Sequence, residues 1–227
     1  MTVAPYSCIL WDVDGTIADA SRGILPRLIR VLASYGLPRP EPEELSRWIG
    51  PPLIESFHLR AGLDADQAEE AVHRYRELAR LAGYASDVEL YPGIAEVIRD
   101  VHAAGVPQST ASSKPEVQVI AILEHFELLD RFTAISGAQP GPGGRGEGKS
   151  EVIARAIERL AAAGADVSRP VLIGDRHHDL DGGAEHGIPV IFAEWGFGEP
   201  SEAEGAVASA ASAAELRALI LPRPLPR

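Results

Sequence analysis

The sequence of 227 residues is poor in cysteine and in long apolar runs. Cys8 is the only cysteine, which excludes an intramolecular disulfide and a metal site built from several cysteines. No apolar stretch approaches the roughly 18 residues of a membrane span, and the N-terminus lacks the basic region and apolar run of a signal peptide. We therefore expect a soluble, cytoplasmic protein with no membrane partner.

Positive charge is also scarce. The chain has 21 lysine and arginine residues and 33 aspartate and glutamate residues, which gives a formal net charge of −12. A chain this acidic is a poor candidate for binding nucleic acid. If its substrate is an anion, local cations must attract that substrate against the overall field. Among the basic residues only Lys114 and Lys149 are lysines, so a lysine in this chain suggests a role that arginine does not fill.

The sequence does contain an alternation of short apolar runs and helical patterns. With 45% hydrophobic and 24% charged residues it has the composition of a globular protein. Short apolar runs bounded by turn residues are typical of buried strands in a parallel sheet, and helices between them predict right-handed crossovers. We therefore expect an α/β fold with a doubly wound, Rossmann-like parallel sheet. The predicted strands span 7–11, a run ending near 112, 132–136, 170–174 and 188–192, with helices at 92–104, 115–129, 150–163 and 180–186.

Residues 17–90 interrupt this alternation, because they contain helical patterns and no convincing strand. Asp64 and Gln67 have the spacing of a capping box at the start of the last of these helices. We expect an all-helical cap subdomain over the carboxyl end of the sheet, because the insertion leaves from the end of the first strand. The predicted helices span 21–35, 51–61 and 64–82, and the predicted core comprises 1–16 and 91–227.

Two carboxylates, Asp12 and Asp14, directly follow the first predicted strand. Ligands of open α/β sheets bind at the carboxyl ends of the strands, where one such carboxylate can be a nucleophile and the other a general acid and base. Gly15 permits a sharp turn, and the Thr16 hydroxyl can donate to an anion. The alternative is a simple Asx-turn in which aspartate and glycine serve the turn alone.

Further carboxylates follow the fourth predicted strand at Asp175 and Asp179. Together with Asp12 and Asp14 they can converge on one hard cation through oxygen ligands, which Mg²⁺ prefers. The alternative for Asp179 is that it caps the helix that follows, and it can do both.

Hydroxyl and ammonium groups mark two other predicted strand ends. Ser112, Ser113 and Lys114 precede a helix, where a hydroxyl and backbone N–H groups can hold a phosphate or simply cap the helix. Lys149 stands at the start of the helix predicted after a glycine-rich segment. Both lysines thus fall on the presumed edge of the site, where a compact ammonium charge has uses that a guanidinium does not match.

With these motifs in this order, the chain resembles the haloacid dehalogenase superfamily, in its phosphoglycolate-phosphatase-like group with a helical cap. The segment 12–16 resembles the first motif of that family, Ser112 the second and Lys149 the third. Gly174 and Asp175, with Asp179, resemble the fourth. The resemblance covers essentially the whole chain, and the segments 49–53, 112–115 and 195–198 also resemble that group.

The resemblance implies a Mg²⁺-dependent phosphomonoester hydrolase that forms an aspartyl-phosphate. In such an enzyme Asp12 attacks phosphorus, and Asp14 protonates the leaving oxygen and later activates water. It further implies that Ser112 and Lys149 bind the phosphoryl oxygens, that Gly15, Thr16, Ser113 and Lys114 contribute to substrate binding, and that Asp12, Asp175, Asp179 and the backbone carbonyl of Asp14 hold the metal.

Several alternatives stay open. A phosphomutase of the β-phosphoglucomutase type shares the core motifs, and a 5'-nucleotidase differs only in its substrate. A phosphate-binding scaffold module is the non-enzyme alternative, although mere binding has no need for Asp14. Arg47 in the cap is either a substrate contact or a solvated helix residue. The expected partner is a small phosphate ester, and the expected state is a monomer or a homodimer.

Overall fold

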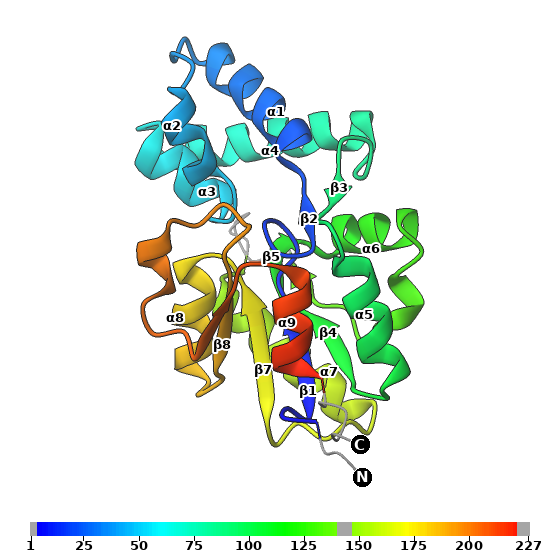
Figure 1. Ribbon diagram of the computed structural model, residues 1–227. Helices are drawn as coiled ribbons and strands as arrows, with labels where there is room; N and C mark the ends of the chain where they lie inside the picture. Colours follow the sequence, from blue (N-terminus) through cyan, green and yellow to red (C-terminus); the bar gives the residue numbers. More distant parts are fainter. Residues whose placement is uncertain (1–3, 140–146, 222–227) are drawn as a thin grey trace.

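The computed structural model describes residues 4–139 and 147–221 and contains a five-stranded parallel sheet with the strand order β4-β1-β7-β8-β9. β1 lies between β4 and β7, so the strand order reverses at β1, and in such sheets ligands bind at the carboxyl end of that point. The arrangement confirms the predicted doubly wound α/β fold (Figure 1). The strands are β1 (Cys8–Trp11), β4 (Gln108–Thr110), β7 (Pro170–Gly174), β8 (Val190–Ala193) and β9 (Ala208–Ala210).

Helices cover both faces of this sheet. Successive residues of β1 point to opposite faces, so Ile9 and Trp11 pack in one apolar cluster while Cys8 and Leu10 pack in another. The first cluster includes α5 and α9, which lie on the near face in Figure 1, and the second includes α7. Within the described ranges, no helix is long and apolar enough to cross a bilayer. The helices of this part are α5 (Ile94–Ala103), α6 (Glu116–His125), α7 (Lys149–Ala162), α8 (His177–Glu185) and α9 (Ala213–Ile220).

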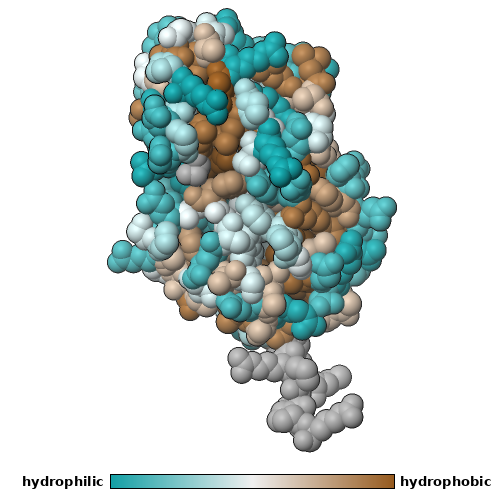
Figure 2. Space-filling model, turned by 45° about the horizontal axis from the view of Figure 1, so that its top comes forward, coloured by the Kyte–Doolittle hydropathy of each residue, from teal (hydrophilic) through white to brown (hydrophobic). Residues whose placement is uncertain are grey.

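The inserted segment forms a helical layer above the carboxyl ends of the strands (Figure 1). It has an apolar cluster of its own, in which Leu28, Phe57 and Tyr75 are buried. The predicted capping box is present, since Asp64 Oδ1 accepts from Gln67 N at 2.9 Å and Gln67 Oε1 accepts from Asp64 N at 3.1 Å. In Figure 2 apolar surface lies over the upper part of the molecule between hydrophilic side chains. The helices are α1 (Ser21–Ser34), α2 (Pro42–Leu45), α3 (Leu53–Glu55), a π-helical turn (Ser56–Arg60) and α4 (Ala65–Ala82).

The expectation that residues 17–90 contain no strand is wrong. β2 (Ala18–Asp19) and β3 (Glu89–Leu90) form a short antiparallel pair where the chain enters and leaves the helical layer. Each strand has two residues, which is too short to give an alternating pattern. The exact division between cap and core stays a prediction.

Other differences concern weak elements of the core. Residues 132–136 are not a strand and contribute only an isolated bridge between Ser109 and Ala134. Beside them, β5 (Ser112–Pro115) and β6 (Gly137–Ala138) form a separate parallel pair. α8 begins at His177, three residues before the predicted start.

Candidate active site

Three buried carboxylates, those of Asp12, Asp175 and Asp179, meet at the carboxyl ends of β1 and β7. One oxygen of each lies within 4.8 Å of the others. The paired strands bring them together, because Asp12 directly follows Trp11 and its N–H donates to Ile173 O of β7 at 2.9 Å. The sequence predicted that Asp12, Asp14, Asp175 and Asp179 converge, and the structure brings together the side chains of Asp12, Asp175 and Asp179 but not that of Asp14.

Lys149, the first residue of α7, supplies an ammonium group to this cluster. Its Nζ lies 2.8 Å from Asp12 Oδ1 and 2.5 Å from Asp179 Oδ1. Burial by itself lowers the pKa of Lys149, but the charges of Asp12 and Asp179 outweigh it and raise the pKa. The ammonium group therefore stays charged at neutral pH, in contact with two of the three carboxylates.

Among the described residues, the charges of this cluster do not balance. One ammonium against three carboxylates leaves two negative charges, which is what a divalent cation neutralises. Burial raises the pKa of Asp175 well above its usual range, and the charges of Asp12 and Asp179 add to the effect. Oxygen donors alone suit a hard cation such as Mg²⁺. The residues present therefore fit that ion, while the carboxylate of Asp14 lies outside the cluster.

Glycines pack tightly around Asp175. Gly15 has φ +88° just after Asp14, and a Cβ at this position would overlap the Asp175 carboxylate. A Cβ at Gly198 would overlap the backbone carbonyl of Asp175. Phe197 N donates to Asp175 Oδ2 at 2.8 Å, so the segment after β8 returns to the site. Backbone atoms of these segments thus help to fix the position of Asp175.

Thr16, a predicted substrate contact, and Asp179, a predicted metal ligand, both make hydrogen bonds within the core. The Thr16 hydroxyl donates to Asp175 Oδ1 at 3.2 Å, because the turn at Gly15 directs it into the core. Asp179 Oδ2 accepts from the backbone N–H groups of Asp175 and Arg176 at 3.1 and 3.0 Å. Asp179 therefore caps α8 and faces the carboxylate cluster at the same time, as the sequence allowed.

Asp14 belongs to a second polar group, in contact with Lys114. Lys114 Nζ lies 2.8 Å from Asp14 Oδ2, and both side chains are largely buried. Lys114 therefore lies beside Asp14 at the site edge, and its part in substrate binding stays a prediction. Burial raises the pKa of Asp14, and the charge of Lys114 offsets this only in part. A raised pKa suits a carboxyl that gives up and takes back a proton.

Ser112 and Ser113 follow β4 beside this pair. Ser112 is buried, and its hydroxyl accepts from Lys114 N at 3.3 Å, which orders the turn. Ser113 faces a pocket between core and cap. Asp14, Lys114 and Ser113 line that pocket, whereas Asp12 and Lys149 do not. The pocket therefore meets the polar site on its Asp14 side.

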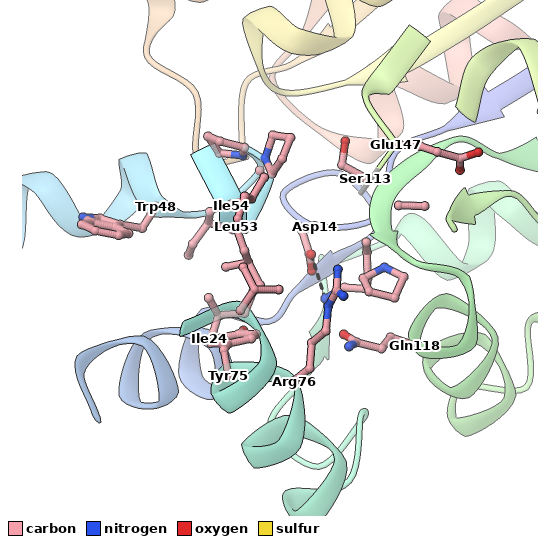
Figure 3. Close-up of a pocket in the computed structure, with 18 residues that line it drawn as sticks. Asp14, Ile24, Trp48, Leu53, Ile54, Tyr75, Arg76, Ser113, Gln118 and Glu147 are labelled. Carbon is pink, nitrogen blue, oxygen red and sulfur yellow. Dashed lines mark ion pairs between the residues drawn. The ribbon is translucent and has the colours of Figure 1, made fainter. Parts of the chain in front are cut away.

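The cap side of the pocket is mostly apolar. Figure 3 shows Ile24, Trp48, Leu53 and Tyr75 on this wall. Arg47 does not line the pocket, because its Nη2 lies 2.9 Å from Glu199 Oε1 at the surface.

Sequence reasoning missed Arg76, which is the cap arginine that lines the pocket. Its position gave a signal, because it continues the buried stripe of α4 formed by Ala68, Val72, Tyr75 and Ala79. It also missed Arg176, whose guanidinium reaches from the core to the cap.

Known proteins resemble this chain over most of its length. Residues 9–193 match the model of the haloacid dehalogenase-like hydrolases. Tyrosine-protein kinase PtkA of Mycobacterium tuberculosis is 37% identical over 190 residues, which cover 84% of this chain but only 62% of PtkA. A 5'-nucleotidase of Pseudomonas aeruginosa is 34% identical and covers 87% of this chain and 86% of that protein. A phosphoglycolate phosphatase of Caulobacter vibrioides is 32% identical, covering 87% and 84%.

Solved structures show the same fold. A crystal structure described as a predicted phosphatase from Clostridium acetobutylicum has a TM-score of 0.85 and 30% identity, over 94% of this chain and 97% of that one. The family model, the relatives and this structure agree with the resemblance inferred from the motifs. The chain therefore belongs to the haloacid dehalogenase-like hydrolase family.

Proposed function

We propose that this protein hydrolyses small phosphomonoesters through an aspartyl-phosphate on Asp12, with Mg²⁺ as cofactor. The observation that carries the proposal is the arrangement of two carboxylates in two different environments. Asp12 contacts the ammonium of Lys149 within the carboxylate cluster, whereas Asp14, two residues on, is buried with a raised pKa. A carboxyl with a raised pKa can carry a proton, while a neighbouring carboxylate serves as the nucleophile.

In the first step, an Asp12 carboxylate oxygen attacks phosphorus, and the bond from phosphorus to the ester oxygen breaks. The Asp14 carboxyl gives its proton to that leaving oxygen, so the alcohol departs neutral. Lys149 and the Ser112 and Ser113 segment stabilise charge on the transferred phosphoryl group. The leaving alcohol departs through the pocket that Asp14 lines.

In the second step, water attacks the phosphorus of the aspartyl-phosphate, and the bond from phosphorus to Asp12 breaks. Asp14, now a carboxylate, takes a proton from this water. Inorganic phosphate leaves, and Asp12 and Asp14 return to their starting states. Lys114 stays beside Asp14 throughout and limits how far its pKa rises.

Asp12, Asp175, Asp179 and the backbone carbonyl of Asp14 are the groups that would hold Mg²⁺. When bound, the ion supplies positive charge that neutralises the phosphoryl oxygens during transfer. The charge imbalance of the buried cluster supports this assignment. The cytoplasmic location and the state as monomer or homodimer stay predictions.

Phosphate release from a panel of esters tests the proposal. The panel contains an aryl phosphate, nucleoside monophosphates, sugar phosphates and phosphoglycolate, each with Mg²⁺ and with excess chelator. We expect release that requires Mg²⁺ and that Asp12→Asn abolishes. Release that persists in chelator would remove the metal from the mechanism, and no release from any ester would overturn the proposal.

A second candidate is phosphoryl transfer to an acceptor other than water, and the 37% identity to PtkA favours it. The same aspartyl-phosphate then reacts with a hydroxyl group. Incubation with ATP and a tyrosine-containing peptide tests for peptide phosphorylation, and a hexose 1-phosphate tests for isomerisation without phosphate release. Phosphorylated peptide or isomerised sugar phosphate at a rate above hydrolysis would favour this candidate.

A further inference from the structure

A second group of side chains that can ligate a metal lies at the start of α8. One ligand atom from each of His177, His178 and Asp181 lies within 4.8 Å of the others, and the proposed function uses none of the three. Asp181 follows His177 by four residues and His178 by three, so the first turn of the helix brings it to the side of both rings. The centroids of the two rings are 3.9 Å apart. Two imidazoles and one carboxylate are thus gathered at one place.

These side chains are accessible to an ion from solvent. The His177 side chain is 47% exposed, Asp181 is exposed, and His178 is half-buried. His178 and Asp181 line a hollow of the surface between α7 and α8, together with two further acids, Glu151 and Glu185. The acids of this hollow attract cations.

The positive groups beside the hollow are already compensated. Lys149 also lines it, but its ammonium contacts two carboxylates of the buried cluster. Arg176, which directly precedes the helix, is paired with Glu202 at 3.0 Å. The positive end of the helix dipole disfavours a cation, and the Asp181 carboxylate in the first turns offsets it. A divalent cation therefore meets a site whose uncompensated charge is negative.

Glu202 contacts one of the rings as an outer carboxylate does in metal sites. Its Oε2 lies 2.7 Å from His177 Nδ1 and also accepts from His177 N at 3.0 Å. A proton on Nδ1 donates to this carboxylate and leaves Nε2 with its lone pair, the form in which imidazole binds a metal. Metal-bound histidines usually donate their other ring N–H to a carboxylate or a carbonyl. The contact therefore supports a ligand role for His177 independently of the spacing of the three residues.

We propose that His177, His178 and Asp181 bind a transition-metal ion such as Zn²⁺, with water completing its coordination. Imidazole nitrogens together with a carboxylate oxygen are ligands that Zn²⁺ accepts, and imidazole favours Zn²⁺, Ni²⁺ and Cu²⁺ over Mg²⁺. The buried carboxylate cluster offers oxygen alone and suits the harder Mg²⁺. The two sites therefore differ in the ion they select, and this inference goes beyond the proposed function because it requires no phosphate ester.

Calorimetric titration of the full chain with Zn²⁺ in excess Mg²⁺ tests the inference. The Mg²⁺ competes for the carboxylate cluster, so that Zn²⁺ reports on the histidine site, and we expect the wild type to bind a single Zn²⁺. His177→Gln and His178→Gln should each weaken this binding by about 100-fold or more, because loss of an outer partner alone costs about 10- to 100-fold. Glu202→Gln should weaken it by about tenfold. Asp181→Ala changes an exposed side chain, so it should fold and should also weaken binding.

His186→Gln is the matched control. His186 directly follows α8 and lines the same hollow, but its Nε2 lies 2.9 Å from Ser150 O and it is not one of the three grouped residues. This variant should bind Zn²⁺ as the wild type does. A wild type that binds no Zn²⁺ would overturn the inference, as would unchanged binding in the two histidine variants and in Asp181→Ala. An equal loss in His186→Gln would also overturn it, because the ion would then lie elsewhere in the hollow. The measurement is of metal binding, so its outcome is separate from any test of phosphate release.

Discussion

Arg176 of the core donates a hydrogen bond through Nη1 to the backbone carbonyl oxygen of Ile49 in the cap. The same side chain pairs through Nε with Glu202 at 3.0 Å and is almost fully buried. Arg176 directly follows Asp175, and its N–H is bound by Asp179. The position of the cap is therefore linked to the residue next to the carboxylate cluster.

Arg176→Met should loosen the cap and lower stability, because it removes one partner of a buried pair. We expect the free energy of unfolding to fall by about 3 kcal/mol and amide exchange near Ile49 to accelerate. Arg47→Met is the control, since the exposed pair of Arg47 with Glu199 also joins cap and core but should matter little. Equal effects of the two substitutions would show that the buried contact has no special role.

Asp12→Asn should leave the fold intact and remove the nucleophile. The amide nearly matches the carboxylate in shape but cannot attack phosphorus, so kcat should fall by about 10³-fold or more. Mass spectrometry of acid-quenched protein should detect a phosphoryl adduct on the wild type alone. Turnover within about tenfold of wild type would exclude Asp12 as the nucleophile.

Without metal, the carboxylate cluster should destabilise the protein as pH rises. Burial raises the pKa of Asp175 well above its usual range and that of Asp179 to about 6, so the folded state binds protons more tightly than the unfolded state. Repulsion between these carboxylates lowers the free energy of unfolding. This effect is absent below the unfolded pKa of about 4 and grows as pH rises through the folded pKa values.

Urea unfolding in chelator measures this effect. Asp175→Asn removes one repelling charge, so its stability advantage over wild type should be small at pH 4 and larger at pH 7. Mg²⁺ should stabilise the wild type and not the variant, since a ligand stabilises only the state that binds it. An advantage of the variant that does not change with pH would contradict this account.

The two lysines should have different kinetic roles. Lys149→Ala should lower kcat by about 10²-fold or more, because the phosphoryl group loses a charge contact, and Lys149→Arg should restore little. Lys114→Met removes the charge that restrains the pKa of Asp14. That pKa then rises further, so Asp14 stays protonated to higher pH. The basic limb of the pH profile of kcat/KM should therefore move to higher pH. A collapse of kcat in Lys114→Met alone would reverse the assignment.

The sequence allowed the parallel sheet and the meeting of Asp12, Asp175 and Asp179 to be predicted, because each depends on local pattern and on strand ends that share an edge. β9 was missed because Ala208, Ser209 and Ala210 carry no large apolar side chain, and its place follows from pairing with β8. A strand was expected at 132–136, where apolar residues border the sheet but make one bridge only.

Contacts between residues far apart in the chain were beyond sequence reasoning. Nothing in the local sequence of Lys114 shows that the Asp14 carboxylate lies within its reach. The contact of Arg176 with Ile49 joins residues 127 positions apart and depends on how the cap is placed. Arg76 alone gave a local signal, as a charge on the buried stripe of α4.

The glycines around Asp175 have a consequence for cation affinity. Mutually repelling carboxylates would normally turn apart, but Gly15 and Gly198 let the backbone close on Asp175 and leave it no room to do so. In the proposed Mg²⁺ site these carboxylates are thus preorganised, because folding and not ion binding gathers them. An incoming ion meets ligands already gathered, so its affinity depends little on conformational change and mostly on charge and dehydration.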